Sequence, residues 1–288
     1  MSKDDRKFAL VTGGNSGIGK YTAIGLLRRG FRVAITSRNP ERGKEALAEI
    51  QRRSESDDVE CLQLDLAQFD SVRACAERVL TDYDRLDLLV NNAGLVLSER
   101  QQTAEGFEMT FGVNHVDHFL LTSLLRSRLV ESAPARVVNL ASDAHKGARK
   151  GLDFDDLHGR ERYSAMDAYC KSKLANIYFT RELARRLEGT GVTVNAVHPG
   201  VVASGFGRDG DVGGVFKVLV AVARPFMISE ERGAATSLHV ATSDELDGQT
   251  GGYYAKSRLA SISKVARDDE AARRLWEMSE AMVAEASA

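Results

Sequence analysis

The chain has 288 residues, a formal net charge of −2 and 43% hydrophobic residues. This composition is typical of a globular protein with a sizeable core, and the balanced charge gives no indication of nucleic acid or an anionic membrane surface as a partner. Cys61, Cys75 and Cys170 are widely spaced and lack ligand spacing, which argues against a disulfide framework and a zinc site.

Short apolar runs alternate with amphipathic stretches along most of the chain. Near-continuous apolar runs are typical of strands that are buried on both faces of a parallel sheet. Strands are expected to begin at Phe8, Phe31, Val59, Leu86, Ala135, Val192 and Gly251. Strand–helix alternation of this kind predicts right-handed βαβ units and an α/β fold: a doubly wound (Rossmann) parallel sheet with helices on both faces.

The helical patterns between these runs carry recognisable starts and stops. The pattern "GIGKYTAIGLLRRG" ends at Gly30, and the next one begins with Asn39 as N-cap and Pro40 as its first residue. A final helix is expected from about Asp268 to Val283. No linker or repeat divides the chain, so residues 1–288 are expected to form a single domain that includes a substrate lid at about 201–232.

The segment "VTGGNSGIGK" follows the first strand and opens the first helix. Glycines at the spacing TGxxxGxG permit a tight turn and a close approach of the backbone to a pyrophosphate, and the helix N-terminus offers unpaired N–H groups. The alternative is a glycine turn that merely joins strand to helix, but this context favours a dinucleotide. The cofactor-binding residues predicted here are Gly13, Asn15, Ser16, Gly17, Ile18 and Gly19.

The second strand ends in "ITSRNP", with Ser37 and Arg38 where a carboxylate would bind the ribose hydroxyls of NAD. A guanidinium at this place can pair with a 2′-phosphate, which an acidic residue would repel. The sequence therefore favours NADP(H), with NAD(H) possible. A solvated loop arginine is the alternative.

Tyr169 and Lys173, in "AYCKSKLANIYFT", lie four residues apart and thus on the same face of a predicted helix. A free tyrosine titrates near ~10, and a lysine cation beside it, helped by oxidised nicotinamide, is expected to lower that pKa. A pKa closer to neutrality suits general acid–base catalysis. The pair therefore predicts a proton donor with an adjustable pKa.

Several motifs together resemble the short-chain dehydrogenase/reductase family. They are TGxxxGxG, the run Asn91-Asn92-Ala93-Gly94, the Tyr-x-x-x-Lys pair and "HPG" at His198, and they follow the order of the family along nearly the whole chain. The segments "VNHVDHFLLT" at Val113, "SDAH" at Ser142 and "GGYYAKSRLASISKVARDDEAARRLWEMS" near the C-terminus are similar to its retinol-dehydrogenase-like branch.

This resemblance implies roles for individual residues. Ser142 would orient the substrate carbonyl, Tyr169 would transfer the proton, Lys173 would tune it and bind the nicotinamide ribose, and Asn114 would hold a relay water. The remaining cofactor contacts implied are Asp65 and Leu66 at the adenine, Asn92, Ala93 and Gly94 in the Asn-Asn-Ala-Gly run, and Pro199, Gly200, Val202 and Ser204 near the carboxamide. His115, His118 and His145 lack a ligand cluster, so no metal is expected.

The expected activity is hydride transfer between a nicotinamide and a carbonyl/alcohol substrate, which the apolar lid sequence suggests is lipophilic. Two alternatives stay open: a non-catalytic NADP(H)-binding sensor or scaffold, and a double-bond reductase that uses the same Tyr/Lys pair. By resemblance, the helices near Glu105–Leu129 and Met166–Leu187 would form a homodimer.

The polar start "MSKDDRK" runs directly into the first strand without a signal-peptide pattern. The longest apolar patch, from Val215, is interrupted by Lys217, Arg224 and Pro225, so it is too short and too charged to cross a bilayer. We therefore expect a soluble, cytoplasmic protein.

Overall fold

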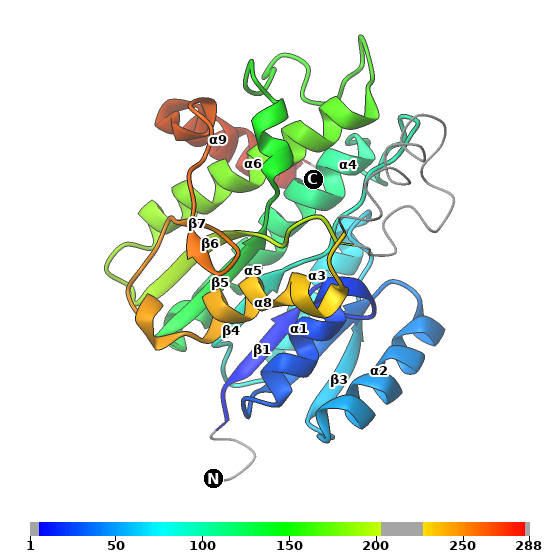
Figure 1. Ribbon diagram of the computed structural model, residues 1–288. Helices are drawn as coiled ribbons and strands as arrows, with labels where there is room; N and C mark the ends of the chain where they lie inside the picture. Colours follow the sequence, from blue (N-terminus) through cyan, green and yellow to red (C-terminus); the bar gives the residue numbers. More distant parts are fainter. Residues whose placement is uncertain (1–5, 203–226, 286–288) are drawn as a thin grey trace.

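The protein is described by a computed structural model that covers residues 6–202 and 227–285. Eight strands form one sheet in the order β3-β2-β1-β4-β5-β6-β7-β8, drawn in Figure 1. They are β1 (Phe8–Val11), β2 (Arg32–Ser37), β3 (Val59–Gln63), β4 (Leu88–Asn91), β5 (Ala135–Leu140), β6 (Val192–His198), β7 (Tyr253–Ala255) and β8 (Arg258–Leu259). β1 to β7 are parallel and β8 is antiparallel to β7, which confirms the predicted doubly wound α/β fold.

Helices cover both faces of this sheet (Figure 1). One face carries α1 (Gly17–Leu27), α2 (Pro40–Ser54) and α8 (Glu230–Thr242), and the other carries α3 (Phe69–Asp82), α5 (Asp117–Glu131) and α6 (Ala165–Arg186). The last helix, α9 (Asp269–Glu285), packs on the outer side of α6. Shorter helical turns are α4 (Met109–Phe111), the π-helical segment Gly112–Val116, and the 3-10 turns Asp143–Gly147, Asp244–Leu246 and Val265–Arg267.

β1 shows why its sequence is apolar throughout. Phe8 and Leu10 join the core beneath α3, α5 and α6, whereas Ala9 and Val11 join the core beneath α1 and α8. Successive side chains of a strand point to opposite faces, so a strand covered on both faces needs apolar residues at every position.

Local sequence signals predicted the start of α2 correctly but did not predict the last strand, β8. The Asn39 side chain accepts a hydrogen bond from the Arg42 backbone N–H at 3.0 Å, so the predicted N-cap of α2 is confirmed. β8 was not predicted, because the turn before it uses Lys256 and Ser257 at φ of 52° and 56°. A two-residue turn of that kind is normally signalled by Asn-Gly or a similar pair.

The predicted lid is only partly described. Residues 203–226 lie outside the described residues, and α8 already begins at Glu230, so the final residues of the expected lid are helical. Val202 forms an isolated bridge with Ile228, which joins the two described ends of this segment.

Candidate functional site

The predicted site residues follow the carboxyl ends of neighbouring strands. β1, β4, β5 and β6 are adjacent in the sheet and end at Val11, Asn91, Leu140 and His198. In parallel α/β sheets, ligands bind outside these ends, at the point where the strand order reverses. Here the order reverses between β1 and β4, beside the glycine turn.

The glycine turn has the backbone that its sequence requires. Gly13 and Gly17 have φ of 61° and 54°, in the left-handed region that favours glycine. A Cβ on Gly19 would lie 2.4 Å from Asn92 Nδ2 and 2.6 Å from Gly13 O, so a larger residue would displace the turn. Asn15 and Ser16 complete the turn before α1.

The start of α1 fits an anionic group. Ser16 is the N-cap residue but its side chain makes no capping bond, and the first turn, which includes Ile18, contains no acidic residue. The N–H groups at the beginning of a helix lack intrahelical partners and carry partial positive charge. With Gly19 admitting close approach, these residues would hold a pyrophosphate.

Thr12 ties the glycine turn to the Asn-Asn-Ala-Gly run, a role that the sequence analysis missed. Its Oγ1 accepts hydrogen bonds from the backbone N–H groups of Asn92 at 2.9 Å and Ala93 at 3.0 Å. The Asn92 amide returns a bond to Thr12 O at 2.8 Å. The threonine of TGxxxGxG was a visible signal, but only the glycines were considered.

The end of β2 presents a cation and no acid. Ser37 is buried and its Oγ donates to Asn39 O at 2.8 Å, while Arg38 beside it is exposed. The next acidic residue in the chain is Glu41, on α2. This pair is compatible with a 2′-phosphate in the way that the sequence predicted.

Asp65 and Leu66 follow β3. The Asp65 carboxylate accepts hydrogen bonds from the Ala67 N–H at 3.1 Å and from Gln68 Nε2 at 3.2 Å, and Leu66 is buried. The aspartate therefore shapes its own turn, and its contact with adenine stays a prediction.

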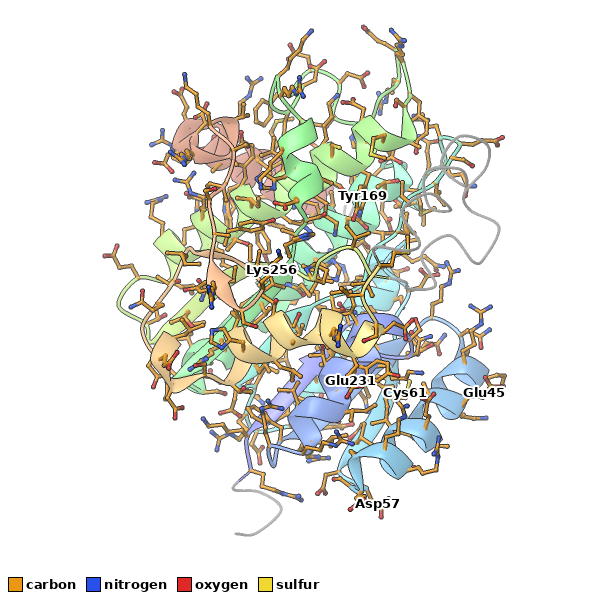
Figure 2. The ribbon with its side chains drawn as sticks, viewed as in Figure 1. Glu45, Asp57, Cys61, Tyr169, Glu231 and Lys256 are labelled. Carbon is orange, nitrogen blue, oxygen red and sulfur yellow. The ribbon has the colours of Figure 1, made fainter. Side chains whose placement is uncertain are left out.

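Ser142, Tyr169 and Lys173 are brought together. Tyr169 lies near the beginning of α6 (Figure 2), and the Ser142 side chain is close enough to lower the pKa of its hydroxyl. Lys173 Nζ lies 5.6 Å from the centre of the tyrosine ring and donates to Leu140 O at 3.0 Å. The lysine is thus fixed to the end of β5, the strand that leads to Ser142.

The pKa of Tyr169 differs from the expectation. Burial raises this pKa to about 12, although the hydrogen bond with Ser142 lowers it. Burial also lowers the pKa of Lys173 to about 8. Among the groups of the protein itself, burial of the tyrosine outweighs the lowering by its polar neighbour, so the pKa is raised. The lowering expected from Lys173 together with oxidised nicotinamide stays a prediction.

Asn114 lies in the π-helical segment, close to Lys173 and Gly94. Its Oδ1 accepts from Leu95 N–H at 2.8 Å, and its Nδ2 donates to Leu95 O and to Ser172 Oγ, each at 3.0 Å. A Cβ on Gly94 would lie 3.1 Å from Asn114 Oδ1 and 3.5 Å from Lys173 Nζ. π-helical segments are frequent at functional sites, but no signal in this sequence identified one.

The neighbours of the Tyr/Lys pair on α6 hold the surrounding loops. Ser172 Oγ accepts from Asn114, and Asn176 Nδ2 donates to Leu140 O at 2.9 Å, the same carbonyl that Lys173 contacts. The polar residues of this helix therefore connect the Tyr/Lys pair to the end of β5 and to the π-helical segment.

The loop after β6 contributes Pro199, Gly200 and Val202. Gly200 has a φ of 91° and Ile228 N–H donates to Val201 O at 2.9 Å. A Cβ on Gly233 would meet both Ile18 and Val202 within 3.2 Å, so two predicted cofactor residues converge on α8. Ser204 lies outside the described residues.

Within residues 6–202 and 227–285, no group of three or more His, Cys, Asp or Glu residues is arranged to hold a metal ion. Among the helices in the described part of the chain, none has the length and apolar character that crossing a membrane requires.

The sequence is similar to a known family of enzymes and to several of its members. The family model described as short chain dehydrogenase matches residues 7–154 and 156–210. Mouse retinol dehydrogenase 12 is 46% identical over 273 residues, which cover 95% of this chain and 85% of the relative. Human retinol dehydrogenase 14 is 42% identical over 292 residues, covering 96% and 86%.

Solved structures show the same fold. A crystal structure of an uncharacterized protein from Mycobacterium paratuberculosis has a TM-score of 0.77 and 32% identity, covering 96% of this chain and 93% of its own. The Pseudomonas aeruginosa RhlG/NADP active-site complex has a TM-score of 0.68 and 29% identity, covering 86% and 94%.

Proposed function

We propose that this protein uses NADP(H) and a lipophilic substrate, with Tyr169 as the general acid or base. The chain belongs to the short-chain dehydrogenase family, in its retinol-dehydrogenase-like branch, and is an oxidoreductase that acts on alcohol/carbonyl pairs. The observation that carries this proposal is that Lys173 Nζ lies 5.6 Å from the centre of the Tyr169 ring, with Ser142 close enough to affect the pKa of the tyrosine.

The residues of the glycine turn, Arg38 and the Asn-Asn-Ala-Gly run would hold the cofactor. When bound, its nicotinamide supplies or accepts the hydride. Ser142 Oγ orients the substrate oxygen, and the Tyr169 hydroxyl gives it a proton. A tyrosine whose pKa is raised to about 12 stays protonated at neutral pH and can therefore act as a proton donor.

Lys173 and Asn114 would supply the proton path behind Tyr169. Both Nδ2 hydrogens of Asn114 are donated, to Leu95 O and Ser172 Oγ, so a relay water would donate to an oxygen of this residue such as its main-chain carbonyl. That carbonyl lies 3.4 Å from Nδ1 of His118, a buried histidine beside it.

The preference for NADP(H) rests on charge. Arg38 follows β2 at a place where the sequence has no carboxylate, and one solved relative is an NADP complex. The lipophilic substrate rests on the names of the relatives, several of which are retinol dehydrogenases. All-trans-retinal and a series of aliphatic aldehydes of increasing length are therefore the first substrates to assay.

Two further parts of the proposal concern the whole protein. We propose a cytoplasmic location, which three free cysteines would suit, and cell fractionation would test it. We retain a homodimer, although α9 already covers Phe119 and Phe179 on the expected dimer surface. Light scattering that gives the monomer mass would contradict the dimer.

The first experiment measures binding of NADPH and NADH to the wild type and to Arg38→Ala by calorimetry. We expect NADPH to bind more tightly than NADH. In the variant, the ratio of the two affinities should fall by roughly tenfold or more, because one charged hydrogen bond to the 2′-phosphate is lost. Lys44→Ala removes the same charge from an exposed position on α2 and serves as the control. Equal affinities in the wild type would contradict the NADP(H) preference.

Tyr169→Phe tests the chemistry. General acid–base groups contribute on the order of 10²- to 10⁴-fold, so kcat should fall by at least 10²-fold while NADPH affinity is retained. Tyr254→Phe, which alters a buried tyrosine of β7 in the core beneath α1 and α8, should keep its turnover. Unchanged kcat in Tyr169→Phe would show that the tyrosine does not transfer the proton, and product analysis separates an alcohol from a reduced double bond.

A further inference from the structure

Two residues that follow Ser142 are tied to the C-terminal part of the chain. His145 lies in the 3-10 turn Asp143–Gly147, three residues after the serine, and is fully buried. Its Nδ1 lies 2.7 Å from Ser142 O, and its Nε2 lies 3.2 Å from the backbone nitrogen of Ser263. Both nitrogens of this ring therefore have a backbone partner.

These partners determine the tautomer of His145. The Ser263 N–H can only donate, so Nε2 accepts and the ring proton is on Nδ1, from which it is donated to Ser142 O. Burial lowers the pKa of this histidine, which favours the neutral ring that this arrangement requires. His145 thus bridges the carbonyl of the proposed catalytic serine to a segment more than a hundred residues away.

Asp143 makes a second tether in the same direction. Its carboxylate accepts a hydrogen bond from the Tyr253 hydroxyl at 3.1 Å, and Tyr253 is a buried residue of β7. The Tyr253 ring also meets the His145 ring edge-on, with centroids 5.2 Å apart and planes at 71°. The side chains of Asp143 and His145, which closely follow Ser142 in the sequence, are therefore both held by the C-terminal region.

The same C-terminal region is fixed to the helix that carries Tyr169. We call Ser263–Arg267 the C-terminal strap. The Tyr178 hydroxyl donates to Val265 O and Arg181 donates to Ala266 O, each at 2.9 Å, and both side chains come from α6. The strap consequently contacts the serine turn through His145 and the tyrosine helix through Tyr178 and Arg181.

We propose that His145 is a positioning residue that fixes Ser142 against Tyr169 by anchoring the serine turn to the C-terminal strap. This inference rests on the proposed function, in which the Ser142 hydroxyl orients the substrate oxygen. Displacement of a reacting group by about 1 Å can cost on the order of 10²-fold in rate, so the anchor matters for kcat more than for cofactor binding.

His145→Phe removes both hydrogen bonds and keeps an aromatic ring against Tyr253. With the fastest substrate of the aldehyde series, kcat should fall about 10- to 100-fold while NADPH affinity is kept. His145→Asn retains an amide donor toward Ser142 O and should recover most of the loss. His239→Phe, at a partly buried histidine of α8 outside this network, is the control.

A double-mutant cycle separates positioning from general destabilisation. If His145 acts through Ser142, then His145→Phe costs little further turnover in a Ser142→Ala background. In the alcohol-oxidising direction, Ser142→Ala and His145→Phe should both shift the kcat profile to higher pH. The reason is that the hydrogen bond from Ser142, which lowers the Tyr169 pKa, is lost or weakened.

The outcomes distinguish the positioning role of His145 from the proposed catalytic role of Ser142. Independent, multiplicative losses of kcat in the double variant would overturn the positioning role and leave the proposed function standing. Wild-type kcat in His145→Phe would do the same. Wild-type kcat in Ser142→Ala would overturn the serine assignment itself and the inference with it. Where His145→Phe fails to fold, His145→Leu, which also removes both hydrogen bonds but with a smaller side chain, and its combination with Ser142→Ala carry the same comparison.

Discussion

Asp117 is buried at the start of α5 with an unusual electrostatic environment. Neither carboxylate oxygen is hydrogen-bonded to another described residue, and the side chain is fully shielded from water. Burial, with the nearby charges of Glu105 and Asp65, raises the pKa of Asp117 to about 9. The residue is therefore protonated in the folded protein at neutral pH.

This shift predicts a pH dependence of stability. The unfolded chain releases the proton of Asp117 near the ordinary aspartate pKa of 3.8, whereas the folded protein keeps it until about pH 9. Between those values the folded state binds more protons, so the free energy of unfolding falls as pH rises, by up to ~1.4 kcal/mol per pH unit. Asp117→Asn should lack this slope and be the more stable protein at pH 8.

Urea denaturation of both proteins at several pH values from 4 to 9 measures this difference. Parallel stability curves for wild type and Asp117→Asn would show that the carboxyl is not protonated in the fold.

The placement of the candidate site residues relative to one another was largely predictable, but their pKa values were not. The spacing of Tyr169 and Lys173 indicated a shared helix face, and the structure places Lys173 beside the tyrosine ring. The direction of the tyrosine pKa depends on how deeply the pair is buried by other elements, which a local pattern does not report. His145 was considered only as a metal ligand, because its partner Ser263 is distant in sequence.

At the scale of elements, the turn between β1 and α1 depends on the absence of a side chain. A Cβ on Gly19 would lie 2.6 Å from Gly13 O, a backbone atom, as well as 2.4 Å from the Asn92 amide. Gly19→Ala should therefore shift the turn and weaken NADPH binding by roughly tenfold or more, since several N–H groups would lose their alignment with the pyrophosphate.

Gly30→Ala provides the matched control for that variant. Gly30 ends the same helical pattern at a φ of 81°, but a Cβ there would meet nothing within 4 Å. We expect it to cost about 1 kcal/mol of stability from backbone strain while calorimetry finds NADPH affinity unchanged. Equal loss of affinity in both variants would show that the effect is general destabilisation.

The strands and long helices could be predicted because their signals are local or periodic. β1 is apolar at each position because helices cover both faces of the sheet, and α2 carries its own cap in Asn39. The π-helical segment around Asn114 and the β7–β8 turn at Lys256 (Figure 2) could not be predicted, since neither contains a residue that demands its geometry. Tertiary packing determines both.

At the scale of the whole molecule, α9 is joined to α5 and α6 through contacts of Trp276. The Trp276 ring lies 4.8 Å from that of Phe119 and 6.0 Å from that of Phe179, and the Arg186 guanidinium lies 4.4 Å from its centre. Trp276 is almost fully buried. The surface that the sequence suggested for a homodimer is therefore partly covered by the chain's own last helix.

Trp276→Ala should destabilise the protein by about 3–5 kcal/mol, the usual cost of removing a large buried aromatic side chain. Trp276→Phe, which keeps an aromatic ring, should lose much less. Denaturation followed by circular dichroism measures both, and light scattering detects whether the uncovered aromatic surface associates. Wild-type stability of the alanine variant would show that α9 contributes little to the core.

The strand order has a consequence for the newly made chain as it leaves the ribosome. β1, β2, β3 and β4 occupy one continuous half of the sheet, and β4 ends at Asn91. Synthesis proceeds at roughly 5–20 residues per second from the N-terminus. The half that carries the glycine turn has all its strands available many seconds before the helix with Tyr169 is complete. The half with the glycine turn can thus be assembled vectorially, ahead of the half that carries the proposed catalytic tyrosine.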